Sequence, residues 1–249
     1  MLTLENVSFA VQADGGEKVI IHDVSLTLPD DRLIVVTGPN GGGKSTLARL
    51  IAGIEKPTAG RILLNGQDIT GLSITERARA GIGFAFQQPV RFKGIRVLDL
   101  LRLASGRPLT VQEACDYLSS VGLCARDYVN REVNASLSGG ELKRIEIATV
   151  FAKRSAVSIF DEPEAGIDLW SFQNLIAMFQ EMRGNISGSS IMIISHQERI
   201  LNIADEIVVM KNGGIDRHGL REEILKGLAG TMLALGSCCK HGQNRGASC

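Results

Sequence analysis

Apolar and polar positions along the chain follow two different periods, and the changes of period predict its elements of secondary structure. Residues 2–11 and 19–28 alternate loosely between apolar and polar on either side of a polar, glycine-containing turn, which predicts an antiparallel hairpin. After it, apolar runs of strand length alternate with stripes of helical spacing, which favours right-handed βαβ units and a largely parallel sheet. The strand-type runs lie at 33–37, 61–65, 81–87, 156–160, 190–194 and 206–210, and the helical stripes at 47–54 and 172–182.

The stretch from about residue 88 to 138 differs from this alternation. Its apolar positions, among them Leu98 and Leu101, suggest short helices, and it carries little strand signal. We therefore expect a single domain over residues 1–235 with an inserted helical subdomain at about 88–138. Residues 236–249 predict a flexible C-terminal tail.

Charge and hydropathy narrow the class of partner. The 249 residues contain 27 basic and 27 acidic side chains, so the formal net charge is zero, which disfavours a strongly electrostatic nucleic-acid binder. The apolar runs are far shorter than the roughly 18 residues of a membrane-spanning helix. The N-terminus also lacks the basic and apolar segments of a secretion signal. We expect a cytoplasmic chain that contacts no nucleic acid and meets a membrane only through a partner.

Five cysteines are scattered along the chain, and in a cytosolic protein such cysteines are expected to be thiols. Cys238, Cys239 and Cys249 lie in the tail together with His241, which raises a metal hypothesis. Their spacing lacks the C-x₂-C pattern of a typical zinc site. The sequence therefore assigns no role to these cysteines.

The strongest chemical signal lies between the strand-type run at 33–37 and the helical stripe that follows it. The signal reads Gly38-Pro39-Asn40-Gly41-Gly42-Gly43-Lys44-Ser45-Thr46, which fits the phosphate-binding P-loop pattern G-x-x-x-x-G-K-[ST]. Glycines let consecutive backbone N–H groups point inward, and the helix N-terminus adds further unpaired N–H groups. We expect Lys44 to reach the β- and γ-phosphates and Ser45 to ligate Mg²⁺. An ordinary glycine-rich turn is the alternative, but strand and helix flank this loop as the pattern requires.

A second chemical signal is an apolar strand that ends in two carboxylates, Asp161 and Glu162. A parallel strand beside the P-loop strand would bring both to the carboxyl edge of the sheet, where open α/β sheets bind ligands. Asp161 would then hold Mg²⁺, and Glu162 would orient and deprotonate the water that attacks the γ-phosphate. A solvated acidic turn is the alternative, and the P-loop is what favours the catalytic interpretation.

The sequence contains a second helix start with glycines, Leu137-Ser138-Gly139-Gly140-Glu141, which predicts another anion site. A single chain has no second phosphate to occupy this site. With these motifs the chain resembles the ABC ATPase superfamily over nearly its whole length. The motifs stand in family order: the P-loop at 38–46, Gln87 after a strand, LSGGE at 137–141, Asp161-Glu162, a D-loop ending in Asp168, and His196 after a strand. The resemblance implies an α/β P-loop NTPase fold with a mostly parallel core sheet, an antiparallel β subdomain and an inserted helical subdomain. It also implies Mg²⁺-dependent ATP hydrolysis and an ATP-dependent homodimer.

The resemblance further implies roles for residues outside the P-loop. Gln87 would ligate Mg²⁺ and couple the nucleotide and water to the helical subdomain, and His196 would bond the γ-phosphate and steady Glu162. The signature residues Ser138 to Glu141 would contact the nucleotide of the other subunit, and Asp168 would lie at the dimer seam. Trp170 is expected to be a packing anchor after the D-loop.

One position departs from the superfamily pattern near the nucleotide base. Many transporter ATPases have a tyrosine under the adenine where this chain has Val11. We expect base stacking to be weakened or supplied elsewhere, which leaves nucleobase selectivity open.

Details after the signature narrow the resemblance to SufC, the ATPase of iron–sulfur cluster assembly, and to its shorter relatives that work with a SufB-like scaffold. The run Glu141-Leu-Lys143-Arg144-Ile-Glu146 and the Gly-Ile-Asp of the D-loop carry the resemblance to SufC. The run from Asp161 to Phe172 resembles the shorter relatives. It implies ATP-driven conformational change in such a scaffold. The alternative is the nucleotide-binding subunit of an ABC membrane transporter, which would show the same core motifs. A DNA-repair ATPase would need a coiled-coil insert or DNA-binding domain, for which the chain has no room.

Overall fold

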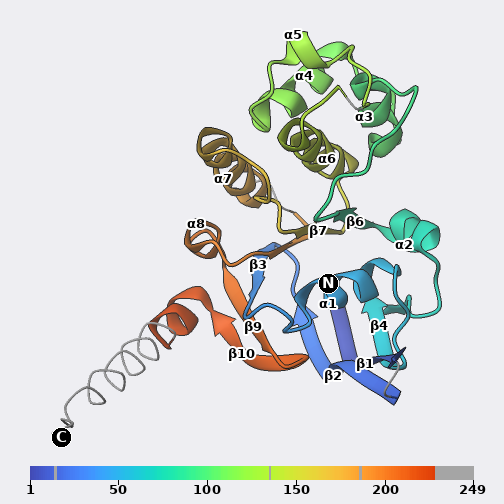
Figure 1. The fold of residues 1–249 in the computed structure, drawn as a ribbon, viewed down its shortest axis with the longest axis vertical. Helices are drawn as coiled ribbons and strands as arrows, with labels where there is room; N and C mark the ends of the chain where they lie inside the picture. The colour runs from blue at the N-terminus through green and yellow to red at the C-terminus, as the bar shows by residue number, and fades with distance from the viewer. Residues whose placement is uncertain (14–15, 135, 185–186, 228–249) are drawn as a thin grey trace, which may run out of the picture.

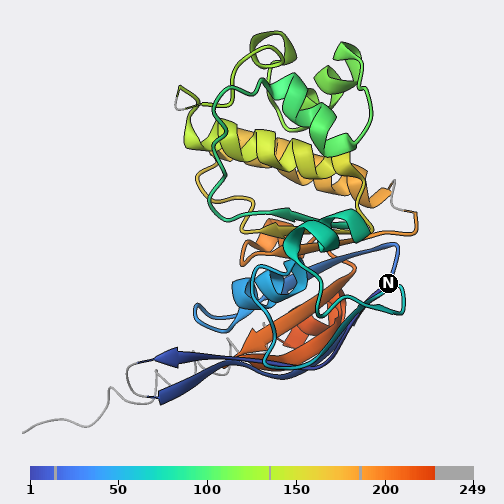
Figure 2. The same cartoon turned by 90° about the vertical axis from the view of Figure 1, so that its right-hand side faces the viewer.

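Two β-sheets enclose one helix in the computed structural model of the chain, which describes residues 1–13, 16–134, 136–184 and 187–227 (Figure 1). The first sheet is antiparallel, with strand order β2-β1-β4-β5. Its strands are β1 (Leu2–Ala13), β2 (Gly16–Leu28), β4 (Ala59–Leu64) and β5 (Gln67–Asp68). Figure 2 shows this sheet edge-on, with α1 (Lys44–Ala52) lying above it. The predicted hairpin is therefore present as β1 and β2.

The second sheet is the parallel core of the molecule, with strand order β10-β9-β3-β8-β7-β6. Only the pair β9–β10 is antiparallel among its described strands. The strands are β3 (Arg32–Thr37), β6 (Ile82–Ala85), β7 (Val157–Asp161), β8 (Ser190–Ile194), β9 (Glu206–Lys211) and β10 (Gly214–Leu220). The predicted fold class, a mostly parallel α/β core with an antiparallel layer, is confirmed.

One detail of the predicted sheet is wrong. The acidic strand β7 does not lie beside the P-loop strand β3, because β8 pairs with both and separates them. The crossover through α7 (Leu169–Gly184) returns the chain into the position next to β3 as β8. Both parallel neighbours still end at the same edge, so the residues after β7 remain close to the P-loop.

The strands of the parallel sheet divide their side chains between two cores. In β3, Ile34 and Val36 pack with α1 and the antiparallel sheet, whereas Leu33 and Val35 face the core formed with the helices on the other side. This division follows from the alternation of side chains along a strand. Both faces of the sheet are therefore covered, as in other α/β proteins with parallel strands.

Helices gather on one side of the parallel sheet, in the upper part of Figure 1. They are α3 (Val97–Ser105), α4 (Val111–Ser120), α5 (Ala125–Tyr128) and α6 (Gly139–Lys153), with α7 beside them. The first three fall within the stretch predicted to be helical. Two short helices, α2 (Ile74–Ala80) and α8 (Glu198–Leu201), lie elsewhere in the chain.

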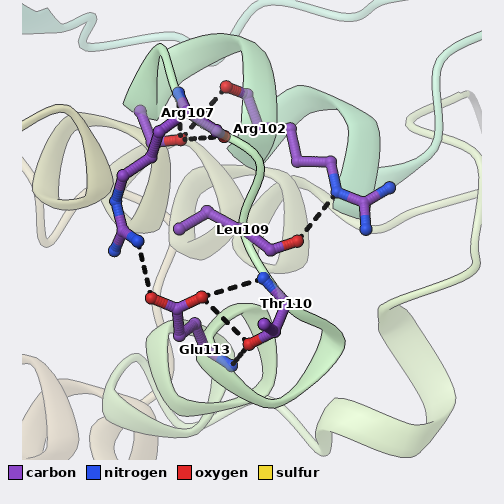
Figure 3. Close-up of polar contacts among 6 residues, drawn as sticks. Arg102, Arg107, Leu109, Thr110 and Glu113 are labelled. Carbon is purple, nitrogen blue, oxygen red and sulfur yellow. Dashed lines mark hydrogen bonds and ion pairs between the residues drawn. The ribbon is translucent and has the colours of Figure 1, made fainter.

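Side chains fix the short connection between α3 and α4 (Figure 3). Arg102 Nε donates to Leu109 O at 3.0 Å, and Thr110 begins α4 as the N-cap of a capping box with Glu113. Arg107 Nη1 donates to Glu113 Oε1 at 2.7 Å. The predicted tail at 236–249, with its three cysteines and His241, lies outside the described residues.

Candidate nucleotide site

The P-loop connects the end of β3 to the start of α1, and its backbone requires glycine. A Cβ at Gly38 would lie 2.0 Å from Met210 O, and one at Gly43 would lie 2.7 Å from Ile21 Cδ1. Both glycines also have positive φ angles, 133° and 96°. Gly43 is the N-cap of α1 and has no side chain with which to cap the helix, so the first-turn N–H groups remain for a phosphate.

Lys44 lies within the loop rather than in solvent. The residue is 7% exposed, and its Nζ donates to Gly38 O at 2.8 Å and to Pro39 O at 2.9 Å. Neutral carbonyls only partly satisfy a buried ammonium. The arrangement therefore holds a cation where a phosphate would meet it.

The next residue, Ser45, meets the acidic strand. Ser45 Oγ donates to Asp161 Oδ1 at 2.9 Å, and Asp161 is 1% exposed at the end of β7. Burial raises the pKa of Asp161, and the Ser45 hydrogen bond acts in the opposite direction. A hydroxyl and a carboxylate oxygen are the hard ligands that Mg²⁺ prefers. These two residues therefore fit a Mg²⁺ site.

Glu162 follows directly and adopts a left-handed backbone conformation, with φ of 46°. Such a conformation is costly for a residue other than glycine and clusters at functional sites. The carboxylate accepts a hydrogen bond from Gln87 Nε2 at 2.5 Å. Gln87 follows β6 at the same edge of the sheet, so the chain brings together two residues that are 75 positions apart.

A cleft of about 690 Å³ opens over these groups, a volume within the usual range of ligand pockets. It combines the P-loop with the ends of β6, β7 and β8. Its lining includes residues 40–46, Gln87, Glu162 and His196. The P-loop and three of the predicted catalytic side chains thus share one cavity.

A hydrogen bond joins the segments that follow β7 and β8, next to His196 in the sequence. Ser195 is 1% exposed, and its Oγ donates to Glu164 Oε1 at 2.5 Å. Burial raises the pKa of Glu164, and the Ser195 hydrogen bond partly offsets this shift. This contact fixes the loop that carries Glu162 relative to the loop that carries His196.

Sequence reasoning missed the residues of β2 that line the cleft. Lys18, Val19 and Ile20 of β2 line it, whereas Val11, the position expected near the base, belongs to β1 and is not among the described lining residues. Val11 pairs with Lys18 across the hairpin. The hairpin register was the available signal, because it identifies the strand that lies opposite Val11.

The signature motif and the D-loop lie together, away from this cleft. Ser138 is the N-cap of α6 and forms a capping box with Glu141, which also accepts a hydrogen bond from Tyr128. Asp168 accepts hydrogen bonds from Trp170 N at 3.1 Å and Ser171 N at 2.9 Å at the start of α7. The described residues that line the cleft include neither Ser138 nor Asp168.

Trp170 does not act as a packing anchor. The residue is 84% exposed, and Leu169 beside it is 64% exposed. The first turn of α7 points these side chains outward because Phe172 and Leu175 occupy its buried face. The prediction for Trp170 is therefore wrong.

The fold and the cleft define a P-loop nucleotide-binding protein with an acidic strand end facing the phosphate loop. The chain belongs to the ABC transporter family, whose model matches residues 21–165. The match includes the P-loop, the signature motif and the Asp161-Glu162 pair. The family pairs ATP with Mg²⁺, and the residues of this cleft fit both.

Similar proteins support the family membership. An uncharacterized ABC transporter ATP-binding protein of Methanocaldococcus jannaschii is 37% identical over 217 residues, which cover 84% of this chain and 86% of that protein. The sulfate/thiosulfate import ATP-binding protein CysA of Synechocystis is 34% identical over 84% of this chain, which spans only 59% of its length. The solved structure of cbiO1 from Clostridium perfringens, part of the ABC transporter complex cbiONQ, has a TM-score of 0.72 and 27% identity, and the match covers 90% of each chain.

The names of these relatives contradict the predicted partner. The relatives are ATP-binding proteins of transporters, so the narrower resemblance to SufC lacks support and the SufB-like partner is wrong. The residues after the signature explain why the resemblance misled. Glu141 accepts hydrogen bonds from Tyr128 and from Ser138 N at the start of α6, and Lys143 forms an ion pair with Glu146. Side chains that serve internal contacts do not identify a partner.

No helix within residues 1–13, 16–134, 136–184 and 187–227 combines the length and the apolar character needed to cross a membrane.

Proposed function

We propose that this chain is the nucleotide-binding subunit of an ABC membrane transporter and that it hydrolyses ATP in a Mg²⁺-dependent reaction. The main observation in support of hydrolysis is that three segments of the chain meet at one cleft. Ser45 of the P-loop bonds Asp161, and Glu162 bonds Gln87. The transporter assignment is supported by the names of the relatives, which describe ATP-binding proteins of transporters.

Different residues of the chain have separate roles in phosphate binding and hydrolysis. Lys44 and the first-turn N–H groups of α1 bind the phosphates, and Ser45 and Asp161 would hold Mg²⁺, which neutralises phosphate charge when bound. Glu162 accepts a proton from the attacking water, and Gln87 holds the Glu162 carboxylate in place through its 2.5 Å hydrogen bond. His196 lines the same cleft and supplies a hydrogen bond to the terminal phosphate.

The signature motif is assigned to a different nucleotide. Ser138 begins α6 on the helical side of the molecule and is exposed. An exposed helix start with two glycines offers free N–H groups to an anion held by another ATP-binding subunit. In this assignment Asp168 lies at the same contact, because Gly140 packs against the D-loop at Gly166 O.

Affinity capture from detergent-solubilised membranes of the native host tests the transporter assignment. The tagged full-length chain is expected to enrich a protein with several membrane-spanning helices over an untagged control strain. A soluble protein as the main enriched partner, with no membrane protein above the control, would overturn the assignment.

A further inference from the structure

A buried lysine on the signature helix contacts the backbone of two catalytic segments. Lys143 lies two residues after the signature and is 1% exposed. Its Nζ donates to Phe86 O and lies 3.5 Å from the carbonyl oxygens of both Gln87 and Asp161. One ammonium group therefore joins α6, the segment after β6 and the end of β7.

A carboxylate one helical turn away completes the arrangement. Glu146 Oε2 lies 3.5 Å from Lys143 Nζ, and Glu146 Oε1 accepts a hydrogen bond from Phe86 N at 3.1 Å. The pair thus holds both backbone polar groups of Phe86, the residue directly before Gln87. Phe86 is also fixed by an edge-on ring contact with Phe84, with centroids 4.8 Å apart.

Stability alone does not account for these two charges. Removing a lysine and a glutamate from water carries a large desolvation cost, and a well-packed apolar pair is often as stable. Burial lowers the pKa of Lys143 and raises that of Glu146 to about 7, so each charged form is held against a desolvation cost. An apolar pair, however, could not form hydrogen bonds to the backbone N–H and carbonyl groups of Phe86.

We propose that Lys143 and Glu146 are positioning residues that set the place of Gln87 and of the Asp161–Glu162 strand end relative to the signature helix. Gln87 Nε2 bonds Glu162, so a shift of the Phe86–Gln87 backbone would move the partner of the proposed base. The inference rests on the proposed ATPase activity.

The same helix provides a matched control. Lys153 also lies on α6 and also donates to a backbone carbonyl, that of Ile82 at 2.6 Å. Burial lowers the pKa of Lys153 as it does that of Lys143. Ile82 is the first residue of β6, whereas Phe86 and Gln87 follow the end of this strand. A purely structural role predicts similar effects of losing either lysine.

Steady-state ATPase kinetics of the full chain compare Lys143→Met with Lys153→Met. We expect Lys143→Met to lower kcat by about tenfold or more with KM for ATP within about threefold, because the P-loop contacts remain. Lys153→Met is expected to keep kcat within about twofold of the unsubstituted chain. Equal kcat values for the two variants would overturn the positioning role, whereas an unsubstituted chain without ATPase activity would overturn the proposed function instead.

A second measurement tests whether Lys143 acts through Gln87. In a Gln87→Ala background, Lys143→Met is expected to lower kcat by less than about twofold, because coupled residues give non-additive losses. Losses that multiply would contradict the inference. Glu146→Gln keeps an oxygen acceptor for Phe86 N and removes one charge. This variant tests the positioning role if Lys143→Met does not fold. We expect Glu146→Gln to lower kcat by about threefold or more, and a folded variant with unchanged kcat would contradict the paired role.

Discussion

Lys44 places a positive charge inside the P-loop, where an anion could bind it. Its ammonium group has two carbonyl partners in the P-loop, and the described carboxylates form no ion pair with it. The sequence predicted a nucleotide-site role for this residue and for Ser45, Asp161 and Glu162, because phosphate chemistry limits which side chains fit these positions. It gave no role to Lys143 or Glu146, since a buried ion pair has no spacing rule that separates it from a surface pair at i, i+3.

Loss of the Lys44 ammonium group should weaken nucleotide binding. We expect Lys44→Ala to raise the dissociation constant for ATP by about tenfold or more, because a charge-assisted hydrogen bond contributes roughly 1.5–3 kcal/mol. Calorimetric titration with ATP measures this change. Lys56→Ala, which removes an exposed lysine after α1, is the control and should bind as the unsubstituted chain does. Equal affinities for the two variants would contradict the role of Lys44.

Local periodicity predicted the strands and helices well, whereas strand order lay beyond it. Alternation along β3 follows from burial of both faces and can be read from a few residues. The insertion of β8 between β3 and β7 depends on how α7 returns the chain across the sheet, which no short stretch encodes. The residues of β2 beside the P-loop were missed for the same reason.

The start of α4 offers a test of how one side chain stabilises a helix (Figure 3). Hydrogen bonds from Thr110, together with the contact to Arg107, lower the pKa of Glu113 from 4.5 to about 2. A carboxyl whose pKa is lower in the folded state stabilises the fold above its unfolded pKa and loses this effect as the pH falls toward about 2. The stabilisation therefore disappears between about pH 4.5 and 2.

Thermal unfolding of Glu113→Gln measures this effect. We expect the variant to have a lower Tm than the unsubstituted chain at pH 7, with the gap narrowing as the pH falls below 4.5. A Tm difference that is the same at pH 7 and pH 3 would show that the charge of Glu113 does not contribute.

In the whole molecule, one cleft combines the ends of β3, β6, β7, β8 and β9 with part of β2. β3, β6, β7 and β8 supply the P-loop, Gln87, Glu162 and His196, and the parallel sheet brings their ends to one edge. The sequence predicted this assembly through its motifs. It did not predict the partner, because the residues after the signature that suggested one make contacts inside the chain.

The rate of ATP hydrolysis by Glu162→Gln, measured beside its affinity for ATP, is the most direct test of the proposed catalytic site. The substitution keeps the shape of the side chain and removes the proposed base. We expect turnover to fall by about 10²-fold or more while ATP binds with nearly unchanged affinity, since a general base contributes typically 10²–10⁴-fold. Hydrolysis at a rate near that of the unsubstituted chain would contradict the assignment of Glu162 and the catalytic interpretation of the cleft.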